Sequence, residues 1–308
     1  MKAAVVDNGA VLVREVPDPQ PAPGQVLVRI RAAGVNGADL AQRAGRYPAP
    51  PGAPRDIPGL ELAGEVVEPG GATRFRTGDR VMALVGGGGQ AELAAVHSRL
   101  LAPVPDAFDW PQAGGFVEVF ATAYDALFTQ AKLAMGERLL VRGAAGGVGV
   151  AAVQLGVACG ASVTGVVRRD EHRRRIRDLG ADTDERGEYD VILELVGGDN
   201  LARDVELLAA RGRLLVIGVG AGARATVDFA RLMQRRARIS ASTLRARPLE
   251  EKALVVRALE RHVLPLVEAG RIAVPVHATY PLEQAQQAYD AFAAGGKFGK
   301  LVLLPGAE

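Results

Sequence analysis

Cysteine is almost absent from this chain, which has one among its 308 residues. A single cysteine excludes an intramolecular disulfide framework and is typical of a reducing compartment. The first residues lack the long apolar segment of a signal peptide, and no apolar run reaches membrane-spanning length. We therefore expect a cytoplasmic protein with no membrane partner.

Aromatic side chains and excess charge are also scarce. Aromatic residues make up 5% of the chain, and the 37 basic residues are balanced by 35 acidic ones, so that the formal net charge is +2. A protein dedicated to nucleic acid usually presents a basic face or exposed aromatic side chains. We therefore expect no nucleic-acid partner.

Two patterns follow one another along the chain. Up to about residue 105, short apolar runs such as 26–30 and 80–84 alternate with turns rich in Gly and Pro, which indicates a mostly β unit. From about residue 110, apolar strands alternate with helical segments, which predicts a parallel sheet covered on both faces. The last apolar segment, 301–304, is expected to return to the first unit. The sequence thus predicts an α/β protein of two domains.

The clearest motif lies between the expected strand 138–142 and the expected helix 148–159. Its spacing matches G-x-G-x-x-G, with Ala144 in the first place. A pyrophosphate would approach the backbone at Gly146, and Gly149 allows close packing of the helix on the sheet. The helix N-terminus offers free N–H groups and a positive dipole to the phosphates. A tight strand-to-helix turn without a ligand is the alternative. The candidate dinucleotide-binding residues are Ala145, Gly146, Gly147, Val148 and Gly149.

The end of the next strand, 162–167, distinguishes between two cofactors. An acidic residue there would accept hydrogen bonds from the ribose of NAD, but this strand runs into Arg168 and Arg169, with His172 one turn later. Guanidinium groups bind a 2′-phosphate bidentately. The pattern therefore favours NADPH over NADH, and the alternative is that both arginines are solvated residues at a helix start.

Six segments spread over the chain carry a family pattern: 34–40, 46–52, 58–64, 120–124, 144–149 and 299–303. Together they resemble the zeta-crystallin-like, zinc-free quinone oxidoreductases of the medium-chain dehydrogenase/reductase superfamily, over essentially the whole chain. The resemblance implies a GroES-like, mostly β catalytic domain over residues 1–115 and 268–308. It also implies a doubly wound Rossmann NADP-binding domain over 116–267, an active site in the cleft between the two domains, and a homodimer joined through edge strands.

The resemblance also implies that no metal is bound. Zinc-dependent relatives carry a cysteine and a histidine at the places that Asn36 and Leu60 occupy here. Glu118 falls near a third ligand position, but one carboxylate cannot make a catalytic zinc site. The only cysteine, Cys159, lies on an apolar helix and is expected to be a buried small hydrophobe.

Hydride transfer to a quinone or an activated enone is the activity that the resemblance implies, and it depends on proximity and orientation. Asn36 and Thr122 would orient the nicotinamide or the acceptor, and Tyr47 would line the acceptor pocket with a hydroxyl able to donate. The alternatives are a turn residue for Asn36 and a helix cap for Thr122. Asp39 and Glu61 are expected to be structural. Further cofactor contacts are expected from Gly218, Val219, Leu244 and Arg245.

The family pattern is incomplete at one place and leaves other functions open. Only residues 183–188 separate two segments between which most relatives carry an extra helix and turn. Relatives often draw an adenosine-phosphate contact from that stretch, so the resemblance does not imply their full set of 2′-phosphate ligands here. Residues 120–124 also resemble enoyl-reductase domains of polyketide synthases, which makes a 2-enoyl thioester reductase one alternative. A non-catalytic NADPH-binding protein, crystallin-like or RNA-binding, is the other.

The expected absence of catalytic zinc leads to the first prediction. Activity should survive prolonged dialysis against EDTA, because Asn36 and Leu60 offer neither the sulfur nor the imidazole that zinc requires. Elemental analysis should find far less than one zinc ion per chain. Stoichiometric zinc, together with loss of activity on its removal, would contradict this interpretation.

Overall fold

The computed structural model describes residues 1–71 and 73–306, which divide into two compact units. The first unit comprises residues 1–121 and the chain from residue 244 onward, and the second comprises residues 122–243. The expected boundaries at 115/116 and 267/268 therefore differ from those of the structure. The larger difference concerns helix α8 (Leu249–His262), which packs on strand β7 (Leu101–Pro103) and helix η1 (Ser98–Leu100) of the first unit. Ala253 of α8 belongs to a hydrophobic core cluster of that unit, and Leu249 packs against the same cluster.

A seven-stranded sheet dominates the first unit. Its strand order is β13-β14-β3-β4-β5-β7, with β6 pairing with β3. The hairpin β1 (Lys2–Asp7) and β2 (Ala10–Glu15) lies outside this sheet. The other strands are β3 (Gln25–Val35), β4 (Glu61–Glu68), β5 (Arg80–Leu84), β6 (Leu93–His97), β13 (Val276–Pro281) and β14 (Lys300–Leu304). The other helices are α1 (Gly37–Arg43), α2 (Trp110–Gly114), α3 (Val117–Tyr124, within which the unit boundary falls), α9 (Leu264–Glu268), η3 (Leu282–Gln284) and α10 (Ala285–Ala294).

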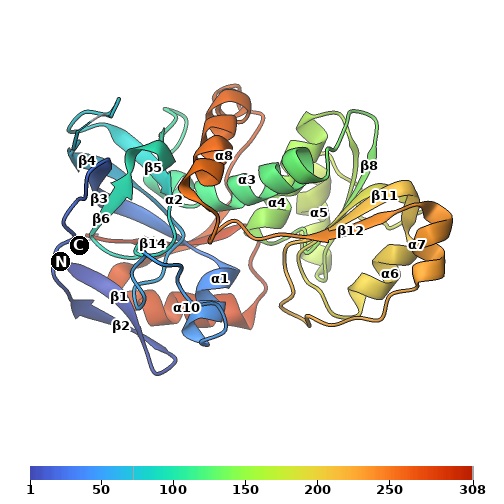
Figure 1. The fold of residues 1–308 in the computed structure, drawn as a ribbon, viewed down its shortest axis with the longest axis horizontal. Helices are drawn as coiled ribbons and strands as arrows, with labels where there is room; N and C mark the ends of the chain where they lie inside the picture. Colours follow the sequence, from blue (N-terminus) through green and yellow to red (C-terminus); the bar gives the residue numbers. More distant parts are fainter. Residues whose placement is uncertain (72, 307–308) are drawn as a thin grey trace. The chain divides into compact units, whose positions relative to one another are not determined.

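The C-terminal strand β14 confirms the expected return to the first unit. It pairs antiparallel with β3, with Leu301 opposite Val35 and Leu303 opposite Ala33. In Figure 1 this red strand lies among the blue strands of the N-terminal region. Leu303 is fully buried, so strand pairing and core packing hold the end of the chain in place.

The second unit is built on a five-stranded parallel sheet with the order β12-β11-β10-β8-β9, which confirms the expected Rossmann-type architecture. Its strands are β8 (Arg138–Arg142), β9 (Ser162–Val166), β10 (Tyr189–Glu194), β11 (Leu208–Val216) and β12 (Arg238–Ala241). Its helices are η2 (Asp125–Gln130), α4 (Gly147–Ala158), α5 (Asp170–Asp178), α6 (Asn200–Glu206) and α7 (Phe229–Arg235). Helix α7 and strand β12 were not predicted from the sequence, since both are short and largely exposed.

The short segment after α5 explains why the sheet ends at β9. Asp182 forms only a single parallel bridge with Thr164 of β9, and residues 183–188 then lead directly into β10. Arg173 contacts Asp184 at 3.0 Å, and Arg177 donates to the Thr183 hydroxyl at 2.9 Å. Side chains of α5 thus hold the segment at the position where one more strand would have formed. No helix in the described ranges has the length and apolar character needed to cross a bilayer.

The packing of β14 leads to a stability prediction. Leu303→Ala should lower the free energy of unfolding by about 2–5 kcal/mol, because it leaves a cavity under a fully buried side chain. The matched control is Leu254→Ala on α8, where the leucine is 69% exposed and the change should stay within about 0.5 kcal/mol. Urea unfolding of both variants tests this, and equal losses would argue against a buried β14.

Candidate active site

The glycine-rich turn of the second unit has the geometry that a dinucleotide requires. Gly146 is the N-cap residue of α4, and no side chain caps that helix. A Cβ atom at Gly149 would lie 2.3 Å from the carbonyl oxygen of Gly143, so packing alone requires glycine there. A Cβ atom at Gly146 would approach the same oxygen only to 3.5 Å, which is ordinary contact. The Gly146 N–H already donates to the Gly143 carbonyl at 3.1 Å, so the N–H groups that follow it in the first turn of α4 are the donors that a pyrophosphate could use.

Two arginines follow the strand beside this turn. The N–H of Ala144 donates to the carbonyl of Val166 at 3.1 Å, which places the turn next to the end of β9. Arg168, two residues later, is exposed and forms no hydrogen bond or ion pair with the described part of the chain. Arg169 is also exposed, with only a 3.4 Å contact to Glu171. Both guanidinium groups are thus available to an anionic ligand.

The other candidates in the second unit differ in accessibility. His172 is buried, and its Nε2 lies 3.6 Å from the Glu171 carboxylate. Gly218 is required by packing, since a Cβ atom there would lie 2.3 Å from the carbonyl oxygen of Leu195. The next residue, Val219, exposes its apolar side chain beyond the end of β11. Val219 is therefore better placed than His172 to contact a ligand directly.

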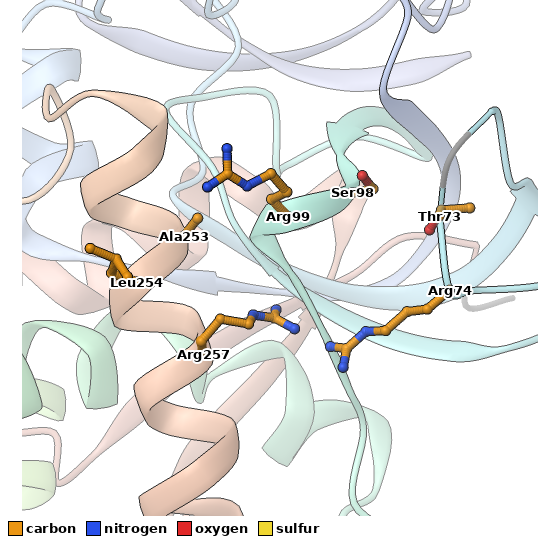
Figure 2. Close-up of a pocket in the computed structure, with 7 residues that line it drawn as sticks. All are labelled: Thr73, Arg74, Ser98, Arg99, Ala253, Leu254 and Arg257. Atoms are coloured by element: carbon orange, nitrogen blue, oxygen red, sulfur yellow. The ribbon is translucent and has the colours of Figure 1, made fainter.

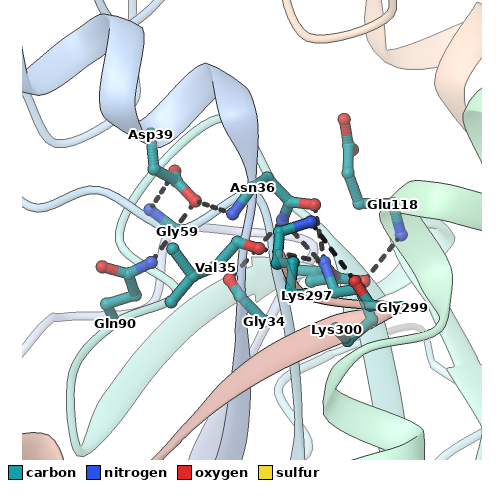
Figure 3. Close-up of polar contacts among 11 residues, drawn as sticks. Gly34, Val35, Asn36, Asp39, Gly59, Gln90, Glu118, Lys297, Gly299 and Lys300 are labelled. Atoms are coloured by element: carbon teal, nitrogen blue, oxygen red, sulfur yellow. Dashed lines mark hydrogen bonds and ion pairs between the residues drawn. The ribbon is translucent and has the colours of Figure 1, made fainter. Parts of the chain in front are cut away.

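A buried ion pair organises the polar residues of the first unit (Figure 3). The ammonium group of Lys300 lies 2.6 Å from Oε1 of Glu61, and the two side chains are 3% and 0% exposed. Lys300 also donates to Oδ1 of Asn36 at 2.7 Å, while Nδ2 of Asn36 donates to Oε1 of Glu61 at 3.0 Å. The backbone N–H of Glu118 donates to Oε2 of Glu61 at 2.9 Å. Both oxygens of the Glu61 carboxylate are therefore saturated.

Asp39 lies beside this group in a second buried set of contacts. It accepts hydrogen bonds from the backbone N–H groups of Asn36 at 2.8 Å and Gly59 at 3.0 Å. Nε2 of Gln90 donates weakly to it at 3.4 Å, and Oε1 of Gln90 accepts from the Tyr289 hydroxyl at 2.8 Å. Burial raises the pKa of Asp39 to about 6, against the opposing effect of the two N–H donors. These contacts agree with a structural role for Asp39.

Arg245 forms hydrogen bonds with the segment that contains Tyr47. Its guanidinium donates to the carbonyl groups of Gly86 at 2.8 Å and Tyr47 at 3.1 Å, and to Oε1 of Gln42 at 2.6 Å. It also lies 5.2 Å from the centre of the Tyr47 ring. Both Arg245 and the preceding Leu244 are buried, and the Tyr47 side chain is half-buried. Arg245 therefore acts through the position of Tyr47, and its donors face protein acceptors in the first unit.

Thr122 and Glu118 occupy the interior and the first turn of α3. Thr122 is the sixth residue of this helix, so the structure excludes the alternative of a helix cap. The Glu118 side chain is only partly buried, and its carboxyl group has no hydrogen-bond partner among the described residues. Burial, and next the neighbouring Glu61 carboxylate, raise the pKa of Glu118 to about 8.

Comparison with known proteins places this arrangement in a family. Residues 22–106 match the alcohol dehydrogenase GroES-like domain, and residues 166–303 match the zinc-binding dehydrogenase family. A quinone oxidoreductase from Rattus norvegicus is 31% identical over 315 residues, which cover 95% of this chain and 93% of that one. The chain belongs to the quinone oxidoreductase family of the medium-chain dehydrogenases/reductases. The sequence resemblance is thereby confirmed, and the protein is an oxidoreductase.

Two further relatives show the range of this family. A mycobacterial protein solved in complex with NADPH is 26% identical, with a TM-score of 0.88 over 99% of this chain and 100% of that one. A polyketide synthase from Streptomyces halstedii is 37% identical over 208 residues, which cover 63% of this chain and 4% of the synthase. The quinone oxidoreductase fold therefore occurs both in separate proteins and within large synthases.

The structure also shows buried polar residues of this oxidoreductase that were not predicted from the sequence. Lys300 begins an apolar strand and Gln90 follows a glycine run, and neither pattern signals burial. Lysine and glutamine are usually exposed, so only the tertiary structure reveals them as buried partners of Glu61 and Asp39. For Glu118, the sequence suggested only a position near an unused zinc ligand. The surroundings of the Glu118 carboxyl group are formed by segments distant in sequence, so the sequence could not show that this group lacks a hydrogen-bond partner among the described residues.

Cysteine and metal-ligating side chains contribute little to the candidate site. Cys159 is half-buried rather than buried, because it is the C-cap of α4, and its thiol contacts the Gly156 carbonyl at 3.2 Å. Within residues 1–71 and 73–306, no three His, Cys, Asp or Glu side chains are placed to hold a metal ion. The absence of catalytic zinc stays a prediction.

A pocket of about 300 Å³ in the first unit lies apart from the Lys300–Glu61 pair and contains three arginines (Figure 2). Arg74 and Arg257 extend toward one another and share the Glu260 carboxylate, while Arg99 pairs with Glu250 at 2.9 Å. Each guanidinium thus already has an acidic partner, unlike Arg168. The pocket is an ion-paired surface feature.

The different surroundings of two glycines lead to a matched pair of variants. Gly149→Ala should lower the free energy of unfolding by roughly 1–3 kcal/mol, because its Cβ collides with backbone. Gly146→Ala should change that energy by less than about 1 kcal/mol but weaken NADPH binding, since its Cβ would occupy the approach of the pyrophosphate. Urea unfolding and fluorescence titration with NADPH measure the two effects. Unchanged NADPH affinity in Gly146→Ala would rule out this turn as the dinucleotide site.

Proposed function

We propose that this oxidoreductase is a zinc-independent, NADPH-dependent reductase that transfers a hydride to a quinone or an activated enone. The observation that carries the proposal is the pair Arg168 and Arg169, exposed and available beside a glycine-rich helix N-terminus. Relatives named quinone oxidoreductase match nearly the whole chain and support the choice of acceptor. We also propose that the protein is a cytoplasmic homodimer.

The second unit would hold the cofactor. The N–H groups at the start of α4 and the open backbone at Gly146 suit the pyrophosphate, and Arg168 and Arg169 suit a 2′-phosphate. Gly218 and Val219 would lie against the nicotinamide, which when bound supplies the hydride. The buried His172 would not contact the phosphate itself; its Nε2 lies 3.6 Å from the Glu171 carboxylate, which Arg169 also contacts. The mycobacterial relative solved with NADPH supports this cofactor.

The residues proposed for the acceptor side fall into two kinds. Tyr47 and Thr122 would contact the acceptor or the nicotinamide, since both side chains are partly accessible. Both ends of the Asn36 amide are already engaged by Lys300 and Glu61, so Asn36 is a positioning residue in this proposal. Arg245 and Leu244 likewise position the segment of Tyr47. A quinone carries polarised carbonyl groups of its own, so orientation and exclusion of water suffice without a metal.

The surface of the second unit supports the proposed homodimer. Strand β12 forms an edge of the sheet, and every one of its residues is exposed. Phe229 and Met233 on the adjacent α7 are 71% and 77% exposed. An exposed sheet edge with apolar neighbours is a surface that proteins commonly cover by association.

A 2-enoyl thioester reductase is the second candidate function, which the similarity to a polyketide synthase favours. The same hydride would add to a conjugated thioester in place of a quinone. Oxidation of NADPH by the purified protein, measured with 1,2-naphthoquinone, with a simple enone and with crotonyl thioester, distinguishes these acceptors. Turnover with the thioester alone would replace the first proposal by the second, and no turnover with any of them would contradict both.

Recognition of the 2′-phosphate leads to the fourth prediction. Arg169→Ala should raise KM for NADPH about 10- to 100-fold with kcat nearly unchanged, because a phosphate contact made equally throughout the reaction is worth roughly 1.5–3 kcal/mol. The double variant Arg168→Ala/Arg169→Ala should lose most of the preference for NADPH over NADH. Arg174→Ala, an exposed arginine on the same helix, serves as the control and should leave both values at wild type. A wild-type protein with equal affinity for NADH and NADPH would exclude the assignment.

A further inference from the structure

Glu118 differs from the other two carboxylates near it in having no hydrogen-bond donor among the described residues. Glu61 is saturated by Lys300, Asn36 and a backbone N–H, and Asp39 accepts two backbone N–H groups. Both of these side chains are fully buried, so neither can reach a substrate. The Glu118 side chain is partly accessible, and its carboxyl group is unpartnered in the part of the chain that the structure describes.

The position of Glu118 on α3 determines where its side chain points. Figure 3 shows the backbone nitrogen of Glu118 joined to the cluster around Glu61 and Lys300, while its side chain points away from that cluster. Thr122 follows four residues later on the same helix, and residues four apart lie on one helix face. Glu118 and the proposed nicotinamide-orienting Thr122 therefore share a face of α3.

The charges that face Glu118 come from several elements of the first unit. The carboxylates of Glu61 and Asp39 disfavour a negative charge on Glu118, whereas Lys300 and Arg245 favour it. Lys252 on α8 also faces it, and burial lowers the pKa of that lysine. Burial outweighs the two cations and holds the pKa of Glu118 at about 8, so its carboxyl group is mostly neutral at pH 7 and carries a proton.

We propose that the carboxyl group of Glu118 is the proton donor to the acceptor, a role that rests on the proposed reductase function. The acceptor gains a hydride from the C4–H bond of the nicotinamide, and the electron pair comes to rest on an acceptor oxygen as an enolate or hydroquinone anion. The O–H bond of Glu118 then breaks, and its proton goes to that oxygen. The Glu118 carboxylate regains a proton from water, so atoms and electrons balance. The Tyr47 hydroxyl would donate a hydrogen bond to the acceptor rather than transfer its proton.

A pH profile of the variants tests the donor role. Glu118→Gln should lower kcat for a simple enone by about 100-fold or more and abolish the decline of kcat above about pH 8, with KM for NADPH unchanged. Glu118→Asp keeps a carboxyl group and should retain part of the activity together with the decline. Glu68→Gln, an exposed glutamate on β4, is the control and should behave as wild type.

Each outcome of these assays decides something different. If the wild type reduces an acceptor and Glu118→Gln has the same kcat and pH profile, the donor role is overturned and the proposed function is not. A wild type that reduces none of the acceptors would overturn the proposed function and, with it, the donor role.

A second measurement needs neither cofactor nor turnover. A carboxyl group whose pKa is about 8 when folded and about 4.3 when unfolded holds more protons in the folded state, so its contribution to stability is lost as pH rises between these values. The free energy of unfolding of the wild type should therefore fall relative to that of Glu118→Gln between about pH 5 and pH 8. Above about pH 8 the difference between the two proteins should be constant. Urea unfolding of the free protein at several pH values measures this. A pH-independent difference would show that Glu118 is not held neutral and would overturn the proposal.

Discussion

The ion pair between Lys300 and Glu61 is the constraint on which the arrangement of the first unit depends. Its charges are nearly removed from solvent, and loss of one partner from such a pair typically costs about 3–5 kcal/mol. Lys300 begins β14, Glu61 begins β4, Asn36 caps α1 and the Glu118 N–H belongs to α3. Segments as far as 264 residues apart in sequence are therefore held at fixed distances by one carboxylate and one ammonium group.

The same buried region gives three neighbouring carboxyl groups three different surroundings. Glu61 contacts an ammonium group and two further donors. Asp39 accepts from two backbone N–H groups, and burial raises its pKa to about 6 against the effect of these donors and of Lys300 and Arg245. Glu118 has no hydrogen-bond donor among the described residues, and burial raises its pKa to about 8. Backbone N–H donors thus oppose the effect of burial on the pKa of Asp39, and no such donor opposes it at Glu118 in the part of the chain that the structure describes.

The second unit depends on close backbone approach rather than on charge. Glycine at position 149 lets α4 lie directly against the turn after β8, and glycine at 218 lets the segment after β11 approach Leu195. The sheet lacks a further strand beyond β9, because residues 183–188 connect Asp182 directly to β10. In our proposal the arginines that follow β9 supply the phosphate contacts, and Arg168 forms no ion pair within the described residues.

The glycine-rich turn, the parallel sheet, the return of the last strand and the family could be predicted from the sequence, because each depends on local spacing or on runs of residue types. The burial of Lys300 against Glu61, the place of α8 in the first unit and the position of Thr122 inside a helix required the tertiary structure. So did the absence of a hydrogen-bond donor to Glu118 among the described residues. Burial and hydrogen bonding of a polar side chain depend on partners that the chain brings from distant segments, and no spacing within one segment encodes them.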